Sequence, residues 1–256
     1  MSVGSFILIK NEITWIKQHL DCWLPWLDEM CFLDGCSTDG TLEVLREYAN
    51  THPQGHKIIL KENKDPKDLK DDYVRLFNEA LRSLSVDWAF FLHPDMACEN
   101  PEAIRDFEWK SGIAAYTSMR SFAGEPGGEI KEIVTGRAEK WKNLFRHKNP
   151  DLGLHYHGWY GSADEDCYFR EITGDEHKHH GEAFHRYPYH VFDSGLKLLH
   201  FSDVRPYERR LDRMIKCLEH QGYGFRAAEL AKEHPRVTLQ DGKGFKFVPY
   251  NAAVAA

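Results

Sequence analysis

The chain has 256 residues and a formal net charge of -7, so it is long enough for one domain with a substantial core, or for a domain with a small appendage. This composition does not predict the broad basic face of a non-specific nucleic-acid binder, although the total leaves room for a local basic patch. Its six cysteines form no Cys-x-x-Cys pair, and its longest apolar runs are too short to span a bilayer. With no signal peptide recognised, we expect a soluble, cytoplasmic protein with free thiols and no transmembrane segment.

Strands and helices are predicted to alternate over the first hundred residues. Short apolar runs with β-forming residues predict strands at 3–9, 29–34, 56–61 and 87–92. Segments with helical spacing of apolar residues follow the first three strands, within 10–24, 41–49 and 73–84. Thr38 or Asp39 is placed to cap the second helix. This alternation indicates βαβ units and a parallel sheet covered by helices on both faces.

The second half of the chain is less regular. Segments 112–119 and 131–146 have the character of longer, antiparallel strands joined through the glycine-rich turn 124–128. The remaining predictions are a helix at 163–172, a histidine-rich polar loop at 177–190, a strand at 196–201, a helix at 205–221 and a frayed tail at 251–256.

Polar clusters follow three of the predicted strands. They are Lys10-Asn11-Glu12, the stretch DGCSTDGT at 34–41, and His93-Pro94-Asp95. Ligands of open α/β sheets bind outside the carboxyl ends of the strands. Each cluster also has a local explanation, because such residues cap helices and begin turns. Their occurrence together predicts a ligand site at this edge.

The order of these clusters resembles that of the family 2 glycosyltransferases, nucleotide-sugar-dependent enzymes of the GT-A fold. Members begin with a strand and an Asn-Glu pair, here Asn11-Glu12, and continue with a strand ending in a variant of DDGSTDGT, here 34–41. An apolar strand ending in Asp-x-Asp comes next, and FFLHPD at 90–95 occupies its place. Glu165-Asp166 resembles the Glu-Asp motif of the family, with Arg170 a few residues later.

The resemblance implies a single GT-A-like α/β domain over 1–256, with a mixed, mainly parallel central sheet and helices on both faces. Within it, 1–110 would bind the nucleotide sugar, 111–220 would form the acceptor and catalytic half, and 221–256 would be a C-terminal extension.

A divalent cation is implied because the diphosphate leaving group of a nucleotide sugar needs charge neutralisation. Asp95 is the expected ligand, and His93 stands where the family has its first aspartate. Since nitrogen ligands suit Mn²⁺ better than Mg²⁺, we expect a manganese preference, weaker binding, or a contact of His93 with sugar or ribose. His200 is the further ligand implied by the resemblance. The alternatives are a degenerate site without metal and a His200 that only caps a strand or the core.

Nucleotide recognition is expected at the same edge. The resemblance implies that Lys10, Asn11 and Glu12 line the base pocket and that Asp34 contacts the uracil or the ribose. Arg75, on the predicted helix 73–84, is a candidate for facing the phosphates.

Acceptor chemistry is expected from the second half. Asp166 is the candidate base that takes the proton of the acceptor hydroxyl, and Glu165 could substitute for it. Asp164 is so near in the sequence that it is also a candidate. Acidic residues also favour the first turn of any helix. Tyr156, Trp159 and Tyr160 form a candidate platform for the apolar faces of a sugar, and a core role is the alternative.

The function that the resemblance implies is a metal-dependent, inverting transfer from a nucleotide-sugar donor, a UDP-sugar, to an acceptor hydroxyl. A saccharide is the expected acceptor, and a nucleic acid is not excluded. One alternative is a nucleotidyltransferase or sugar-nucleotide hydrolase of the same fold, although no glycine-rich basic loop follows the first strand. The other is a non-catalytic module that binds a sugar or a nucleotide.

Overall fold

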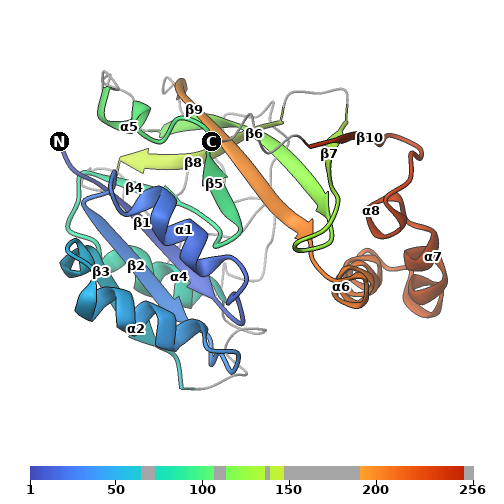
Figure 1. Cartoon of the computed structure of the whole chain (residues 1–256), viewed down its shortest axis with the longest axis horizontal. Coiled ribbons are helices and arrows are strands. Elements are labelled where there is room, and N and C mark those ends of the chain that lie inside the picture. Colours follow the sequence, from blue (N-terminus) through green and yellow to red (C-terminus); the bar gives the residue numbers. More distant parts are fainter. Residues whose placement is uncertain (65–72, 107–113, 136–138, 147–190, 251–256) are drawn as a thin grey trace. The chain divides into compact units, whose positions relative to one another are not determined.

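The computed structural model describes residues 1–64, 73–106, 114–135, 139–146 and 191–250 (Figure 1). The predicted helix 163–172, the histidine-rich loop 177–190 and the tail 251–256 lie outside these residues. The chain divides into two compact units, Met1–Ser118 with Lys140–Leu196 and Met119–Glu139 with Lys197–Ala256. The single GT-A-like domain and its three functional segments therefore stay predictions.

The first unit is built on a parallel sheet. Its parallel strands are β1 (Val3–Ile9), β2 (Glu29–Asp34), β3 (Ile58–Glu62) and β4 (Trp88–Phe91). They lie in the order β4-β1-β2-β3, and β8 (Glu139–Arg146) joins β4 in antiparallel orientation. The register pairs Ile9 with Asp34 and Asp34 with Glu62. The carboxyl ends of β1, β2 and β3 are therefore level at one edge.

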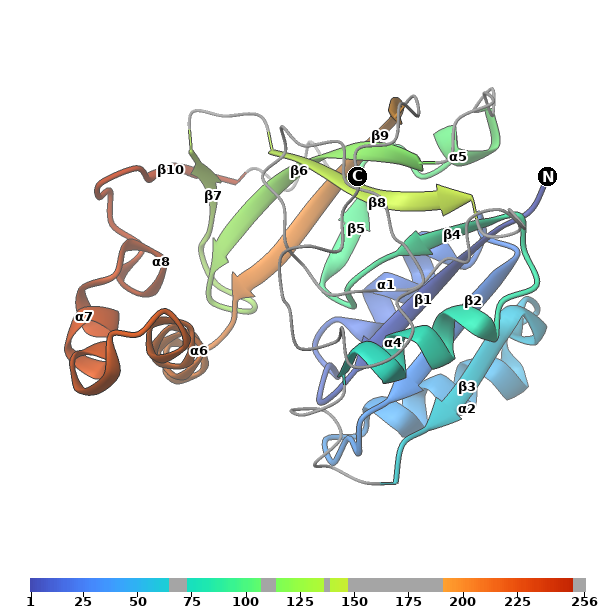
Figure 2. The ribbon, with the colours of Figure 1, turned by 180° about the vertical axis from the view of Figure 1, so that it is seen from behind.

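Helices cover both faces of this sheet, as the periodicity predicted. α1 (Ile16–Trp23) and α2 (Thr41–Thr51) lie on one face, and α4 (Tyr73–Arg82) lies on the other (Figures 1 and 2). The buried side of α1 repeats at helical spacing and consists of Ile16, His19, Leu20 and Trp23. The short elements of the unit are η1 (Gly55–Lys57), β5 (Met96–Cys98) and α5 (Ala103–Asp106).

The core of the first unit is aromatic around β4, all of whose residues are buried. Trp23 from α1 meets Phe90 edge to face, with ring centroids 5.2 Å apart. Trp88 and Phe6 are also fully buried. Each such side chain contributes about 1.5–3 kcal/mol on leaving water, so this packing fixes α1 against the strands that carry the polar clusters.

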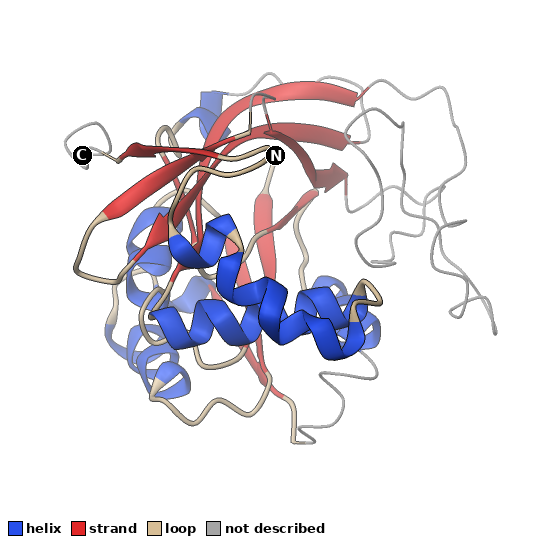
Figure 3. Cartoon of the chain, turned by 90° about the vertical axis from the view of Figure 1, so that its right-hand side faces the viewer, coloured by secondary structure: helices blue, strands red, loops and turns tan. Residues whose placement is uncertain are grey.

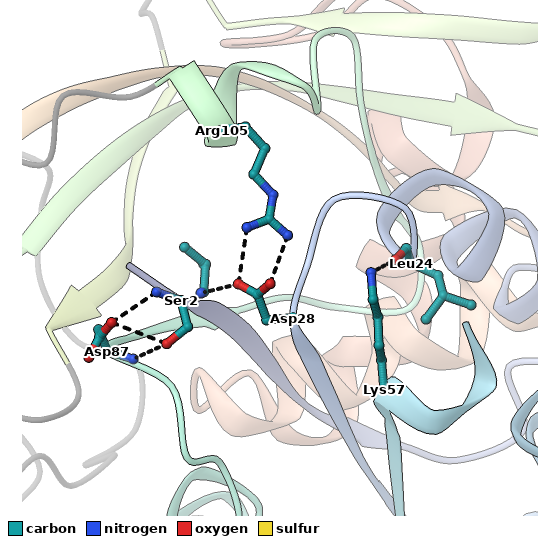
Figure 4. Close-up of polar contacts among 7 residues, drawn as sticks. Ser2, Leu24, Asp28, Lys57, Asp87 and Arg105 are labelled. Atoms are coloured by element: carbon teal, nitrogen blue, oxygen red, sulfur yellow. Dashed lines mark hydrogen bonds and ion pairs between the residues drawn. The ribbon is translucent and has the colours of Figure 1, made fainter. Parts of the chain in front are cut away.

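Polar contacts hold the amino end of the sheet (Figure 4). The Asp87 carboxylate accepts hydrogen bonds from the Ser2 N–H and hydroxyl, at 2.9 and 3.1 Å. The Asp28 carboxylate accepts from the Val3 N–H and from both terminal nitrogens of Arg105. Partial burial raises the pKa of Asp28, but these hydrogen bonds outweigh it and the net pKa lies below its ordinary value. These contacts anchor the start of β1.

The second unit contains an antiparallel hairpin and a helical cluster. β6 (Ala114–Gly124) pairs with β7 (Ile130–Val134), and β7 pairs with β10 (Lys246–Pro249). The glycine-rich turn 124–128 joins β6 to β7 as predicted. Segment 131–146 contains two strands, β7 and β8, in place of the single predicted one: β7 pairs with β6 and β10, and β8 pairs with β6 and β4. β9 (Val191–Val204) is longer than the predicted strand 196–201.

The helical cluster follows β9 and confirms the predicted helix 205–221. Its helices are α6 (Tyr207–His220), η3 (Gly224–Arg226), α7 (Ala227–Glu233) and α8 (Pro235–Thr238) (Figure 3). They pack around the buried residues Leu218, Ala227 and Ala231. Across the described ranges, every helix is too short or too polar to cross a bilayer.

Candidate functional site

Asp34 ends β2 and is buried, with 2% of its surface exposed. Its Oδ2 accepts a hydrogen bond from the Ser37 N–H at 3.0 Å, and its carbonyl accepts from the Asn63 N–H at 2.8 Å. Its Oδ1 is buried and meets no hydrogen-bond donor among residues 1–64, 73–106, 114–135, 139–146 and 191–250. A buried acceptor without a donor costs about 1–3 kcal/mol, so this oxygen suits a donor group supplied by a ligand.

The loop after β2 is closed by unusual backbone conformations. Cys36 and Gly40 have φ of 62° and 96°, in the left-handed region, and the Cys36 thiol donates to the Asn63 carbonyl at 3.0 Å. The Asp39 carboxylate accepts from the Thr41 N–H at 3.0 Å and from the Ile13 N–H at 3.1 Å. The N-cap position of α2 is Gly40 and neither of the two predicted residues, but the Asp39 carboxylate accepts from the first N–H of the helix.

Hydrogen bonds also set the pKa of Asp39. Partial burial raises it, but the hydrogen bonds from Thr41 and from the backbone outweigh burial and leave the pKa below its ordinary value. Asp39 is therefore ionised at neutral pH and holds the amino end of α2 together with the loop after β1.

The loop after β1 is bonded to the loop after β2. Asn11 adopts φ of 57°, a conformation that asparagine tolerates better than most residues. Its N–H donates to Ser37 Oγ at 2.9 Å, and its Oδ1 accepts from the Thr38 N–H at 2.8 Å. The Glu12 N–H donates to Thr41 Oγ1 at 2.8 Å. The predicted clusters at 10–12 and 34–41 thus form one hydrogen-bonded surface at the sheet edge.

His93 and Asp95 follow β4, the parallel neighbour of β1, so they leave the sheet at the same edge. Asp95 is buried, with 5% of its surface exposed. His93 is partly buried, and its ring meets Phe91 at 5.0 Å between centroids. The Met96 N–H donates to the His93 carbonyl at 3.0 Å and closes a tight turn around Asp95. The fold therefore brings the three predicted clusters to one edge.

The predicted metal ligands belong to different units. Asp95 and His93 lie in the first unit and His200 lies on β9 in the second, so this three-ligand set stays a prediction. Over the described part of the chain, no three His, Cys, Asp or Glu side chains gather into a metal site. A buried carboxylate with an imidazole two residues away fits a cation that takes most of its ligands from a diphosphate.

The remaining predicted site residues differ in how much of them the structure describes. Lys10 is exposed next to Asn11. The backbone of Arg75 belongs to α4, but its side chain is outside the description. The predicted acceptor and catalytic residues also lie outside the described residues; they are Tyr156, Trp159, Tyr160, Glu165 and Asp166.

Sequence reasoning missed His19 and Trp23 of α1. His19 Nδ1 and Trp23 Nε1 both lie 3.1 Å from the Met96 carbonyl oxygen. Burial lowers the pKa of His19 to about 4, so the imidazole is neutral near pH 7. Helical spacing from Ile16 marks His19 as buried, but its partner is 77 residues away in the chain and carries no local signal.

Comparisons with known proteins agree with the motif order. The chain matches the model of the glycosyl transferase family 2 over residues 6–148, more than half of its 256 residues. No curated protein sequence matches it significantly.

Two ligand-bound solved structures are similar to parts of the chain. One is mannosyltransferase PcManGT from Pyrobaculum calidifontis with GDP-Man and Mn²⁺, at 23% identity and a TM-score of 0.37, covering 44% of this chain and 34% of that one. The other is S. aureus TarS with UDP-GlcNAc, at 16% identity and a TM-score of 0.37, covering 47% and 35%. The matches span only about a third of these two proteins.

Another structure of S. aureus TarS 1-349 is similar over 91% of this chain and 72% of that one, at 14% identity and a TM-score of 0.43. The family match begins within β1, includes β2 to β4 and contains all three polar clusters. On the strength of that match, the chain belongs to glycosyl transferase family 2.

Proposed function

We propose that the chain transfers a sugar from a nucleotide-sugar donor to an acceptor hydroxyl, and that the edge formed by β1, β2 and β4 holds the donor. The observation that carries this proposal is the buried Oδ1 of Asp34, which meets no donor among the described residues. A base N–H or a ribose hydroxyl can supply the missing hydrogen bond. Family membership gives independent support.

Hydrogen bonds between the loops after β1 and β2 order this edge before a ligand binds. Asn11, Ser37 and Thr38 are bonded to one another, so the donor meets a surface that is already ordered. The donor we expect is a UDP-sugar. Asp34 would orient its nucleoside, and the exposed Lys10 would lie beside it.

The diphosphate end of the donor would lie toward Asp95. A divalent cation bound there would neutralise the charge that develops on the leaving diphosphate. Asp95 would hold it, with His93 and His200 as further candidates and Mn²⁺ preferred to Mg²⁺. Asp166 would accept the proton of the acceptor hydroxyl, with inversion at the sugar carbon. A saccharide is the acceptor class we propose.

The test is release of nucleoside diphosphate from UDP-, GDP- and dTDP-sugars, each with Mn²⁺, Mg²⁺ or EDTA. Asp34→Asn is compared with Asp28→Asn, a matched change at the opposite end of the sheet. A hydrogen bond to a charged group is worth about 1.5–3 kcal/mol, so Asp34→Asn should weaken donor binding roughly 10- to 150-fold. Asp28→Asn should leave donor binding unchanged.

The outcomes separate the proposal from its alternatives. Nucleotide binding without release of nucleoside diphosphate, and without any effect of Asp166→Asn, would mean a non-catalytic binding module. Equal weakening by Asp34→Asn and Asp28→Asn in folded protein would mean that the donor does not contact Asp34.

A further inference from the structure

Two N–H groups of α1 converge on one backbone carbonyl directly after Asp95. His19 Nδ1 and Trp23 Nε1 each lie 3.1 Å from the oxygen of Met96. Because a carbonyl only accepts hydrogen bonds, Nδ1 of His19 carries the proton. The side chains of His19 and Trp23 and the residue Met96 are 1%, 0% and 1% exposed. The contact is therefore fully shielded from water.

Hydrogen bonds hold Met96 through both its carbonyl oxygen and its N–H. His19 and Trp23 are four residues apart, so their rings project from the same face of the helix. Their two hydrogen bonds use both lone pairs of the carbonyl. The Met96 N–H also donates to His93. The turn that contains Asp95 cannot shift without breaking one of these three hydrogen bonds.

Burying the polar ring of His19 costs free energy of desolvation, which the apolar side chains beside it on α1 do not incur. Ile16 and Leu20 fill the same buried face with apolar side chains. The Nε2 of His19 is buried and has no hydrogen-bond partner in the described part of the chain. Desolvation lowers its pKa to about 4 and keeps it neutral. An aliphatic side chain would avoid burying this nitrogen but would lose the bond to Met96.

We infer that His19 and Trp23 are positioning residues of the donor site: their hydrogen bonds to Met96 hold the Asp95 carboxylate in place before a cation and a nucleotide arrive. The inference rests on the proposed function, because a fixed position of the Asp95 carboxylate matters for binding only if the donor and its cation bind there. Preorganisation of this kind lowers the free energy that binding must spend on ordering the site.

The variants are chosen to remove single hydrogen bonds. Trp23→Phe deletes one N–H and keeps a buried ring, and His19→Leu deletes the other. His19→Asn carries an amide N–H near the position of Nδ1 and should restore part of the effect. Ile16→Val is the matched control, since it trims the same face of α1, lowers the melting temperature comparably and leaves the Met96 carbonyl bonded.

The readout is the Mn²⁺ concentration at half-saturation in the presence of saturating UDP, followed by calorimetry, with UDP affinity in EDTA measured in parallel. Trp23→Phe and His19→Leu should each raise the Mn²⁺ requirement roughly 5- to 10-fold, which corresponds to the loss of one hydrogen bond. UDP affinity in EDTA should stay within about twofold, and Ile16→Val should match the wild type in both measurements.

Each other result overturns a stated claim. An unchanged Mn²⁺ requirement in Trp23→Phe and His19→Leu would make the contact structural only, which overturns the inference and leaves the proposed function standing. An equal rise in Ile16→Val would also overturn it, because loss of stability alone would then explain the effect. If the wild type binds no UDP with Mn²⁺, the UDP-donor proposal fails and this inference fails with it. Should His19→Leu not fold, Trp23→Phe decides the question.

Discussion

Because His19 is buried and neutral in the folded protein, the free energy of unfolding should fall on acidification. Burial lowers its pKa to about 4 from the ordinary 6.5, while nearby Asp95 raises the pKa and His93 lowers it. Between these values the unfolded chain binds a proton that the folded chain does not. This contribution to stability is therefore full above pH 6.5, is lost as the pH falls, and levels off below pH 4. At about 1.4 kcal/mol per pKa unit, the loss is about 3 kcal/mol.

Urea unfolding from about pH 7 to about pH 4 measures this loss as a difference between wild type and His19→Leu. The carboxylates with lowered pKa, among them Asp21, Asp28 and Asp39, also lose stabilisation in acid, but they do so in both proteins and cancel. The wild type should lose about 3 kcal/mol more than the variant over this range. If the free energies of unfolding of the wild type and His19→Leu fall by the same amount with pH, within about 1 kcal/mol, the assignment of a buried, neutral imidazole is refuted.

Three further substitutions test the loops of the site. Gly40→Ala should lower the free energy of unfolding by about 1–2 kcal/mol, because φ at this position is 96° and alanine disfavours the left-handed conformation. The new Cβ would lie 3.6 Å from Ile13 Cδ1 and would not clash, so an unchanged free energy of unfolding in urea would contradict a cost of the backbone conformation. Asp39→Ala removes the carboxylate that accepts from the Thr41 and Ile13 N–H groups and should cost about 1 kcal/mol in the same assay, whereas a neutral result would mean that these hydrogen bonds are dispensable. Asp34→Asn keeps an acceptor for Ser37 and removes a buried charge, so the ligand-free melting temperature should stay level or rise; a marked fall would show that this carboxylate stabilises the fold.

The sequence was informative where the pattern is local. The apolar runs and helical spacings of the first hundred residues predict β1 to β4 with α1, α2 and α4, because each element is set by residues close together in the chain. Parallel strands have level carboxyl ends, so the convergence of Asn11, Asp34 and Asp95 on one edge was also predictable. The STDG stretch likewise indicated where α2 begins, although its N-cap position is Gly40 and Asp39 accepts from the first N–H of the helix.

Contacts between distant residues were not predictable in this way. The bond from His19 to Met96 joins residues 77 positions apart, and a buried histidine on a helix has no periodic signature that identifies its partner. The three-residue strand β5 is too short to show a pattern. The strand predicted over 131–146 is two strands, β7 and β8, and the strands with which each of them pairs are a tertiary property that the local pattern does not carry.

The most direct test of the donor site is thermal melting with UDP, GDP, CDP or dTDP, each with Mn²⁺, Mg²⁺ or EDTA, in wild type and Asp95→Ala. A ligand at a hundred times its Kd adds about 2.7 kcal/mol, or roughly 5–10 °C for a protein of this size. We predict such a rise with one nucleoside diphosphate and Mn²⁺, smaller in EDTA and in Asp95→Ala. No rise with any of the four would contradict a nucleotide-sugar site at the ends of β1, β2 and β4.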